Sequence, residues 1–270
     1  MNQIAQDVMP TITKWILQLT FFCMHFQLPL IGYAMNLESP EISQSSSKPI
    51  YPIFMPPNQW DLVDSSALSP SVLVAYVDRS TTGFLPSINL AIEKTDLSQK
   101  EYLREAKALY ELDIKNRWRE LGIISTKAGK GMLTAIDTTC NWGPVRILQL
   151  ILISKKTAYI LTASASKEEF ATFYPTFKEA FRSLVLTDDL TLLINQKEKK
   201  QKLYDNLEAF KQTFKQLNNK NADPSELNAL WHTLQQNLQH DYKEMGSYWH
   251  VQLVKLLQAQ MKSLIESKDG

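Results

Sequence analysis

Residues 145–164 read VRILQLILISKKTAYILTAS, and this stretch decides the fold. From Val145 to Ile153, apolar residues occupy most positions on both faces of an extended strand. Such a strand belongs in the middle of a sheet that is covered on both faces. Lys155-Lys156 separates it from a second apolar run, Ala158–Ser164, and so short a connection predicts antiparallel pairing of the two strands.

Further strands and two helices flank this pair. The other strand candidates are Tyr51–Met55, Trp60–Val63, Val72–Val77, Ser87–Ile92, Gly122–Thr126 and Gly131–Thr138. Apolar residues recur at helical spacing over Ser98–Ile114 and again over Ser166–Leu184. In the second helix Ser166 is the expected N-cap, with Glu169 completing a capping box. The predicted fold class is α+β, with an antiparallel sheet packed between helices.

The first 48 residues divide into an apolar segment and a linker. Trp15–Ala34 is mostly apolar and closes in small residues, Gly32 and Ala34, which suit cleavage by a signal peptidase. We therefore expect residues 1–34 to be a signal peptide or an N-terminal anchor, and a cytosolic amphipathic helix is the third interpretation. Residues 35–48 are rich in Ser, Pro and Glu and are expected to form a flexible linker.

Residues 188–270 are predicted to be a helical tail that follows a domain over residues 49–187. An apolar seam begins with Leu203, Leu207, Phe210, Phe214 and Leu217, whose 4-3-4-3 spacing is that of a coiled coil. Asp223-Pro224 provides an N-cap and a first-turn proline for a second helix, which carries Trp231. A third segment with Trp249 continues the pattern after Gly246. This helical hairpin must bury its seam against itself, against the middle domain or against another chain.

Charge and composition exclude several classes of protein. The chain has 270 residues and a formal net charge of +1, from 29 Lys and Arg against 28 Asp and Glu. It therefore has no large basic field for nucleic acid or an anionic membrane, and membrane contact is expected only through an uncleaved N-terminal segment. The two cysteines cannot build a disulfide framework or a four-cysteine metal site.

No pattern of catalytic or metal-binding residues stands out. Gly129-Lys130-Gly131 lacks the remainder of a phosphate-binding loop and is expected to be a hairpin turn. Cys140 has no histidine near it in the sequence. His232, His240 and His250 are 8 and 10 residues apart, which places them on different helix faces. We expect a protein that is not an enzyme, with no catalytic residue, cofactor or metal.

The middle domain resembles the PsbP-like superfamily over residues 50–187. The resemblance is carried by Phe84–Leu90 (FLPSINL) and by Gln149–Leu184, with AYILTASAS and the spaced aromatic residues Phe170, Tyr174 and Phe177. This superfamily includes extrinsic photosystem II proteins, a Ran-binding import factor and DcrB-type bacterial envelope proteins. The resemblance implies an antiparallel sheet between helices and a role in binding or assembly. The helical tail lies outside it.

These observations predict an exported bacterial envelope protein, periplasmic or otherwise in the cell envelope, that acts by protein binding or assembly. The alternative is a cytoplasmic secretion-system chaperone or adaptor that cradles an apolar helix of a client. The partner is a protein, or a second copy bound through the C-terminal helices. Trp142 lies in a predicted loop, Asn141–Pro144, where it either fills the core or anchors a partner. The candidate partner-binding residues are Trp142, Phe84, Phe210, Phe214, Trp231 and Trp249.

Overall fold

The computed structural model describes residues 49–220 and 223–266, which divide into two compact units. The sheet unit comprises residues 56–184. The helical unit comprises residues 49–55 and 185–266. The sheet unit is therefore inserted, in sequence, between two segments of the helical unit. The expected segments 1–34 and 35–48 lie outside the described residues.

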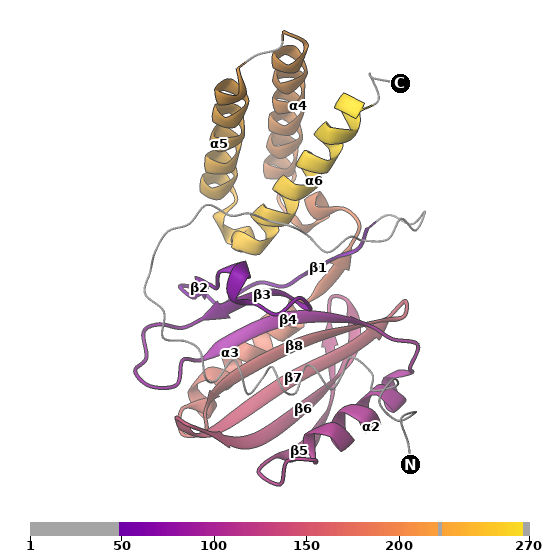
Figure 1. The fold of residues 1–270 in the computed structure, drawn as a ribbon, viewed down its shortest axis with the longest axis vertical. Coiled ribbons are helices and arrows are strands. Elements are labelled where there is room, and N and C mark those ends of the chain that lie inside the picture. The colour runs from indigo at the N-terminus through magenta and orange to yellow at the C-terminus, as the bar shows by residue number, and fades with distance from the viewer. Residues whose placement is uncertain (1–48, 221–222, 267–270) are drawn as a thin grey trace, which may run out of the picture. The chain divides into compact units, whose positions relative to one another are not determined.

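The sheet unit contains a seven-stranded antiparallel sheet with the order β2-β3-β4-β8-β7-β6-β5 (Figure 1). Its strands are β2 (Asp61–Leu62), β3 (Val72–Val77), β4 (Ser87–Lys94), β5 (Arg117–Thr126), β6 (Gly129–Cys140), β7 (Gly143–Ser154) and β8 (Thr157–Ser166). A short 3-10 helix, η2 (Ser65–Ala67), joins β2 to β3. The long strands β5 to β8 follow one another through tight turns, as the short breaks in the sequence predict.

Two helices cover the two faces of this sheet. β7 lies between β6 and β8, and every residue from Ile147 to Leu152 is buried. α2 (Gln99–Tyr110) packs on one face, with Leu103 against a cluster that includes Ile147. α3 (Phe170–Arg182) packs against β7 and β8 with its aromatic stripe. The predicted α+β fold, with an antiparallel sheet between helices, is confirmed.

α2 is shorter than the pattern over Ser98–Ile114 predicts. Ser98 caps its first turn, and Glu101 completes the capping box. The helix ends at Tyr110, and the next residues form a turn in which the Asp113 side chain accepts from the backbone of Lys115 (2.9 Å). Ile114, expected on the buried helical stripe, is 95% exposed in this turn. The local hydrogen bonds of an Asx turn compete here with continued helix.

α3 also begins later than expected. Ser166 ends β8, where it pairs with Val145, and the helix starts at Phe170. The predicted capping box is absent, because the N-cap of α3 is Glu169, but Ser166 and Glu169 do contact each other. The Ser166 hydroxyl donates to the Glu169 carboxylate (2.8 Å) and accepts from the Glu169 amide (3.2 Å). These bonds therefore close the connection from strand to helix, one turn before the helix itself.

The helical unit combines a two-stranded ribbon with three long helices. Its elements are β1 (Tyr51–Ile53), β9 (Val185–Thr187), η3 (Leu190–Leu193), α4 (Lys197–Asn219), α5 (Pro224–Asp241), η4 (Lys243–Met245) and α6 (Gly246–Glu266). β1 and β9 pair with each other in antiparallel register, and neither belongs to the large sheet. The boundaries expected at 49 and 187 therefore differ from those of the structure, since both strands fall in the helical unit.

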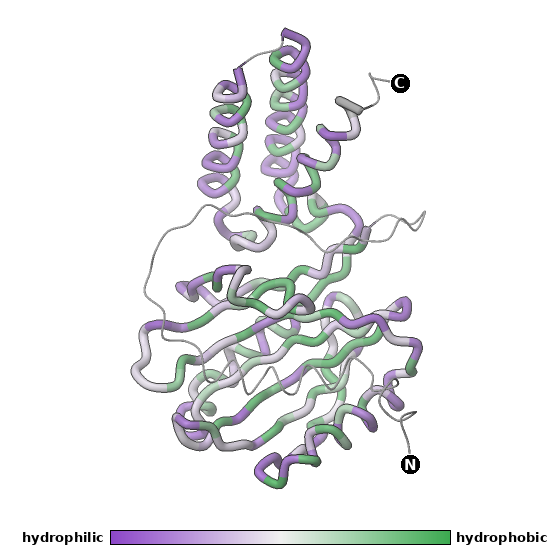
Figure 2. Tube along the Cα trace, in the orientation of Figure 1, coloured by the Kyte–Doolittle hydropathy of each residue, from purple (hydrophilic) through white to green (hydrophobic). Residues whose placement is uncertain are grey.

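Apolar residues account for the contacts inside each unit. Figure 2 shows hydrophobic colour along the central strands and mixed colour around α4 and α5, as expected for buried strands and amphipathic helices. In the sheet unit, Phe177 is fully buried and its ring contacts Phe170 and Trp60, with centroids 5.8 and 6.1 Å apart. Phe177 thus joins α3 to the loop before β2.

The substitution Phe177→Ala tests this core. We expect it to lower the free energy of unfolding by about 3–5 kcal/mol, because it removes a fully buried ring and leaves a cavity. Glu168→Ala, at an exposed position before α3, is the control and should change stability by less than about 1 kcal/mol. Chemical denaturation measures both, and similar losses for the two variants would contradict this assignment of the core.

The sheet unit is proposed to fold on its own, without the helical unit. A chain restricted to residues 56–184 is expected to unfold in one cooperative thermal transition and to keep near-UV circular dichroism, because it retains the whole seven-stranded sheet with α2 and α3. A chain that aggregates or lacks fixed aromatic signals would show that the sheet unit depends on the helical unit.

Candidate protein-binding surface

Trp142 projects from the hairpin that joins β6 to β7. Cys140 and Gly143 pair across the end of the two strands, which leaves Asn141 and Trp142 as the turn. Gly143 has a φ of +104°, a backbone conformation that residues with a β-carbon rarely adopt. The Trp142 side chain is 51% exposed, so it does not fill the core. Its role as a partner anchor remains a prediction.

A cluster of cations surrounds Asp137 near the base of this hairpin. Asp137 lies directly opposite Arg146, whose guanidinium contacts both carboxylate oxygens, Nη2 to Oδ2 at 2.9 Å. Arg119 Nη2 and Lys167 Nζ lie 3.3 and 3.4 Å from Oδ2. The Arg146 guanidinium also lies over the Phe170 ring, 5.3 Å from its centroid. Arg146 is therefore fixed by an ion pair on one side and an aromatic face on the other.

The cluster has a surplus of positive charge. Hydrogen bonding to Arg146, together with the charges of Arg119 and Lys167, lowers the pKa of Asp137 to about 2, so this carboxylate is ionised at neutral pH. Arg117 lies opposite Asp137 on β5 and is exposed. One carboxylate thus forms ion pairs with three cations, and Arg117 adds a fourth positive charge on the neighbouring strand. The side chains of Arg119 and Lys167 are half exposed. The surface formed by Arg117, Arg119, Arg146 and Lys167 is called the cationic corner below.

Sequence reasoning missed the cationic corner because its members come from two strands and a loop that are far apart in the sequence. One signal was available in the decisive stretch. In Val145–Ile153 the second alternating row reads Arg146, Leu148, Leu150 and Leu152, so a charge begins a row that is otherwise apolar. A charged side chain on an otherwise buried row needs an oppositely charged partner, or must lie near the end of the helix that covers the row. Arg146 does both.

Phe84 lies in the sheet unit but offers little free surface. It is partly buried and packs against the cluster under α2, as does Cys140 at the end of β6. Phe84 and Trp142 are therefore in different environments, although the sequence grouped them as possible partner contacts. Of these two side chains, Trp142 is the accessible one.

The four aromatic candidates of the tail lie mostly inside the helical unit. Phe210 and Phe214 on α4 are buried, and their rings lie 4.5 and 6.2 Å from Trp231 on α5. Trp249 on α6 is fully buried, and its indole nitrogen donates to the backbone oxygen of Leu190 (3.0 Å). The seam is closed by the chain's own helices, so Phe210, Phe214 and Trp249 are core contacts, and Trp231 is partly exposed.

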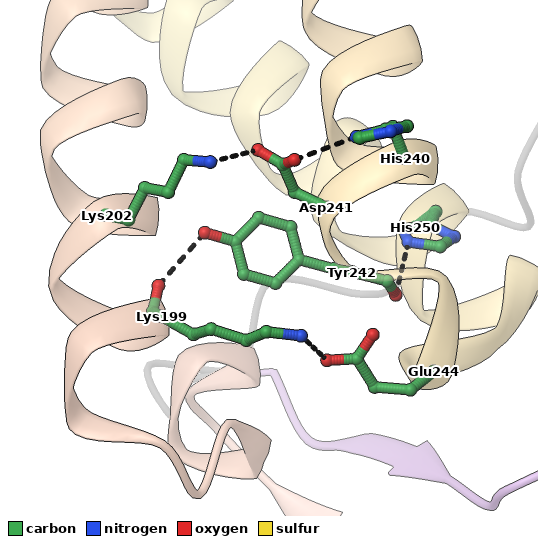
Figure 3. Close-up of polar contacts among 7 residues, drawn as sticks. All are labelled: Lys199, Lys202, His240, Asp241, Tyr242, Glu244 and His250. Carbon is green, nitrogen blue, oxygen red and sulfur yellow. Dashed lines mark hydrogen bonds and ion pairs between the residues drawn. The ribbon is translucent and has the colours of Figure 1, made fainter.

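Polar contacts also tie α4 to the turn between α5 and α6 (Figure 3). The Tyr242 hydroxyl donates to the backbone oxygen of Lys199 (2.9 Å), and Lys202 forms an ion pair with Asp241 (2.8 Å). His250 is buried, and its Nε2 lies 3.0 Å from the backbone oxygen of Tyr242. Desolvation lowers the pKa of His250, which favours the neutral ring as a hydrogen-bond donor.

A cluster of buried polar side chains lies under α2 in the sheet unit. The Gln149 side-chain amide donates to the Tyr110 hydroxyl (3.0 Å) and to Thr162 Oγ1 (3.2 Å). Gln149 Oε1, Thr134 Oγ1 and Trp118 Nε1 are buried, and the described part of the chain provides no partner for these three atoms. Such atoms are the ones that ordered water usually satisfies.

Within residues 49–220 and 223–266, no group of three or more His, Cys, Asp or Glu side chains has the arrangement of a metal site. Among the same residues, no helix combines the length and the apolar character needed to span a bilayer.

Comparison with known proteins finds likeness in structure rather than in sequence. No family model and no curated protein matches the chain. Similar solved structures include LpqN, involved in cell envelope biogenesis of Mycobacterium tuberculosis, with 14% identity, a TM-score of 0.39 and coverage of 52% of this chain and 85% of LpqN.

Two further structures belong to groups named in the sequence analysis. Cyanobacterial PsbP (CyanoP) from Synechocystis is 14% identical, with a TM-score of 0.36 and coverage of 56% of this chain and 99% of CyanoP. The Ran-binding protein Mog1p of Saccharomyces cerevisiae is 16% identical, with a TM-score of 0.32 and coverage of 46% of this chain and 84% of Mog1p. Each of these likenesses concerns the fold and covers about half of this chain.

Proposed function

We propose that this protein is a non-enzymatic binding or assembly factor whose sheet unit contacts a protein partner through the Trp142 hairpin. The observation that carries the proposal is the half-exposed indole at the tip of a hairpin between two long strands. A large aromatic side chain held on a rigid element is the kind of residue that dominates binding energy in interfaces. The neighbouring cationic corner supplies charge for orienting a partner.

The tail is assigned a structural role in this proposal. Self-association through the C-terminal helices and a chaperone that cradles a client helix both need an open apolar seam. The burial of Phe210 and Phe214 against Trp231 gives those alternatives no support.

The finer part of the proposal is export to the cell envelope. It rests on the apolar run Trp15–Ala34 with the small residues Gly32 and Ala34 at its end. The protein would then meet its envelope partner after export. Its sheet unit would bind that partner without needing a disulfide bond.

Photo-crosslinking in the native cell tests the binding surface. A photoreactive amino acid at exposed Asn141 is expected to give a discrete protein adduct, and adding Trp142→Ala should remove most of it. Trp142→Ala should leave the melting temperature nearly unchanged, because the side chain is half exposed. The same photoreactive group at Lys155, in the β7–β8 turn, is the control. An undiminished adduct in Trp142→Ala, or no adduct from Asn141, would contradict the proposal.

Processing of the N-terminus tests export. Mass spectrometry of the protein from its native cell is expected to find a chain that begins at Met35, after removal of residues 1–34. Ala34→Phe should block this cleavage, because the signal peptidase accepts only small residues at that position, and a larger precursor should accumulate. Ser46→Phe, outside the cleavage site, serves as the control. An intact Met1 in the cytoplasm would favour the chaperone or adaptor alternative.

A further inference from the structure

β5 is the outer strand on one side of the seven-stranded sheet. It pairs with β6 along its inner side, and none of the described residues forms a strand against its outer side. The opposite border of the sheet is the two-residue strand β2. A free edge ten residues long is a ready template for another extended chain, because its outward backbone groups lack a strand partner.

The side chains of this edge select against pairing with a second copy. Arg117 and Arg119 are alternate residues on the face that carries Asp137, and both are exposed. If two β5 strands paired in a register that placed these arginines opposite one another, like charges would meet across the new ladder, which is unfavourable. Charged residues and bulges on edge strands are common devices against self-association. β5 has both, since its register shifts between Glu120 and Gly122.

The same residues favour an acidic chain. An added strand places a side chain directly opposite each residue of β5, about 5 Å away, and its side chains alternate between faces. Acidic residues at alternate positions would therefore meet Arg117 and Arg119, whereas Arg146 lies two strands further in and Lys167 follows β8, the third strand in. Asp137 does not neutralise this group of cations by itself.

The second half of β5 offers apolar contact. Leu121, in the bulge that interrupts the ladder, is 47% exposed, and Ile123, beyond the bulge, is 69% exposed. Ile114, in the turn that leads into β5, is 95% exposed. A segment that pairs with the arginine half of β5 thus finds exposed aliphatic side chains along the rest of the strand.

Resting on the proposed function, we propose that the partner binds through an acidic, extended segment that adds as a strand to the outer edge of β5, with its carboxylates on the cationic corner. Backbone hydrogen bonds to β5 supply affinity, and alternate acidic side chains supply specificity. Trp142, at the tip of the hairpin that presents Asp137 and Arg146, contacts the partner outside this segment.

Selection from a random octapeptide library on the immobilised full chain tests this proposal directly. The expected consensus has Asp or Glu at alternate positions. Fluorescein-labelled selected peptides are then titrated by anisotropy against the wild type and against Arg117→Glu/Arg119→Glu, which should bind about tenfold or more weakly. Hydrogen exchange should show protection on peptide binding within residues 117–126.

Lys100→Glu/Lys155→Glu is the matched control, because it makes the same change in net charge at two exposed lysines outside β5. It should bind the peptides within about twofold of the wild type. Arg119 contacts Asp137, so thermal melting checks that the double variant is folded, and Arg117→Glu alone replaces it if it is not. Selected peptides without acidic residues, no selected peptide, equal binding by the β5 variant, or protection elsewhere would each overturn the proposal.

Failure here is distinguishable from failure of the proposed function. A partner crosslinked from Asn141 whose binding is insensitive to Arg117→Glu/Arg119→Glu would retain the hairpin as a binding surface and exclude the acidic strand. Loss of the adduct in both Trp142→Ala and the β5 variant, with retention in the lysine control, supports both.

Discussion

The burial of β7 on both faces is the constraint on which the sheet unit depends. Ile147 to Leu152 alternate across the strand, and all six side chains are buried, so the sheet needs a helix on each side. α2 and α3 meet this need, and their position leaves β5 at the border. An edge strand with the same apolar pattern would be prone to pair with other chains, because its outer backbone groups lack a strand partner. The pattern of β5, with charges in its first half, follows from that location.

The same constraint explains why so much of the sheet unit could be predicted. A strand that is apolar on both faces, short turns between strands, and helices with apolar stripes are local signals, and each agrees with the others. The boundaries of α2 and α3 were less predictable. Ser98 and Ser166 both have the sequence pattern of a helix N-cap. Ser166, however, pairs with Val145 in the ladder between β7 and β8, and the helix that follows it starts one turn later. Pairing between strands overrode the local signal.

The candidate surface was only half predictable, for a different reason. The sequence placed Trp142 in a short loop but left open whether it fills the core or anchors a partner, and the structure shows it half exposed. The cationic corner depends on register: Arg117, Asp137 and Arg146 lie side by side only because β5, β6 and β7 pair as they do. Near-zero net charge conceals such a group, since a few cations can gather locally while the total stays balanced. The aromatic seam of the tail had the opposite outcome, because a coiled-coil spacing does not say which helix will cover it.

The insertion of the sheet unit into the helical unit links the folding of the two. The chain leaves the helical unit after Met55 and returns to it at Val185, and the strands at these two points pair with each other, Ile53 opposite Val185. Pairing β1 with β9 closes a loop that contains the whole sheet unit. As with a crosslink, closing a loop of unfolded chain costs conformational entropy. The pairing of β1 with β9 therefore stabilises the helical unit most when the sheet unit between them is folded, because a folded insert holds its own two ends in a fixed relation while an unfolded one must lose entropy to bring them together. Folding of the sheet unit should thus precede closure of the ribbon, and the strand predicted over Tyr51–Met55 finds its partner in a segment more than 130 residues later only after that step.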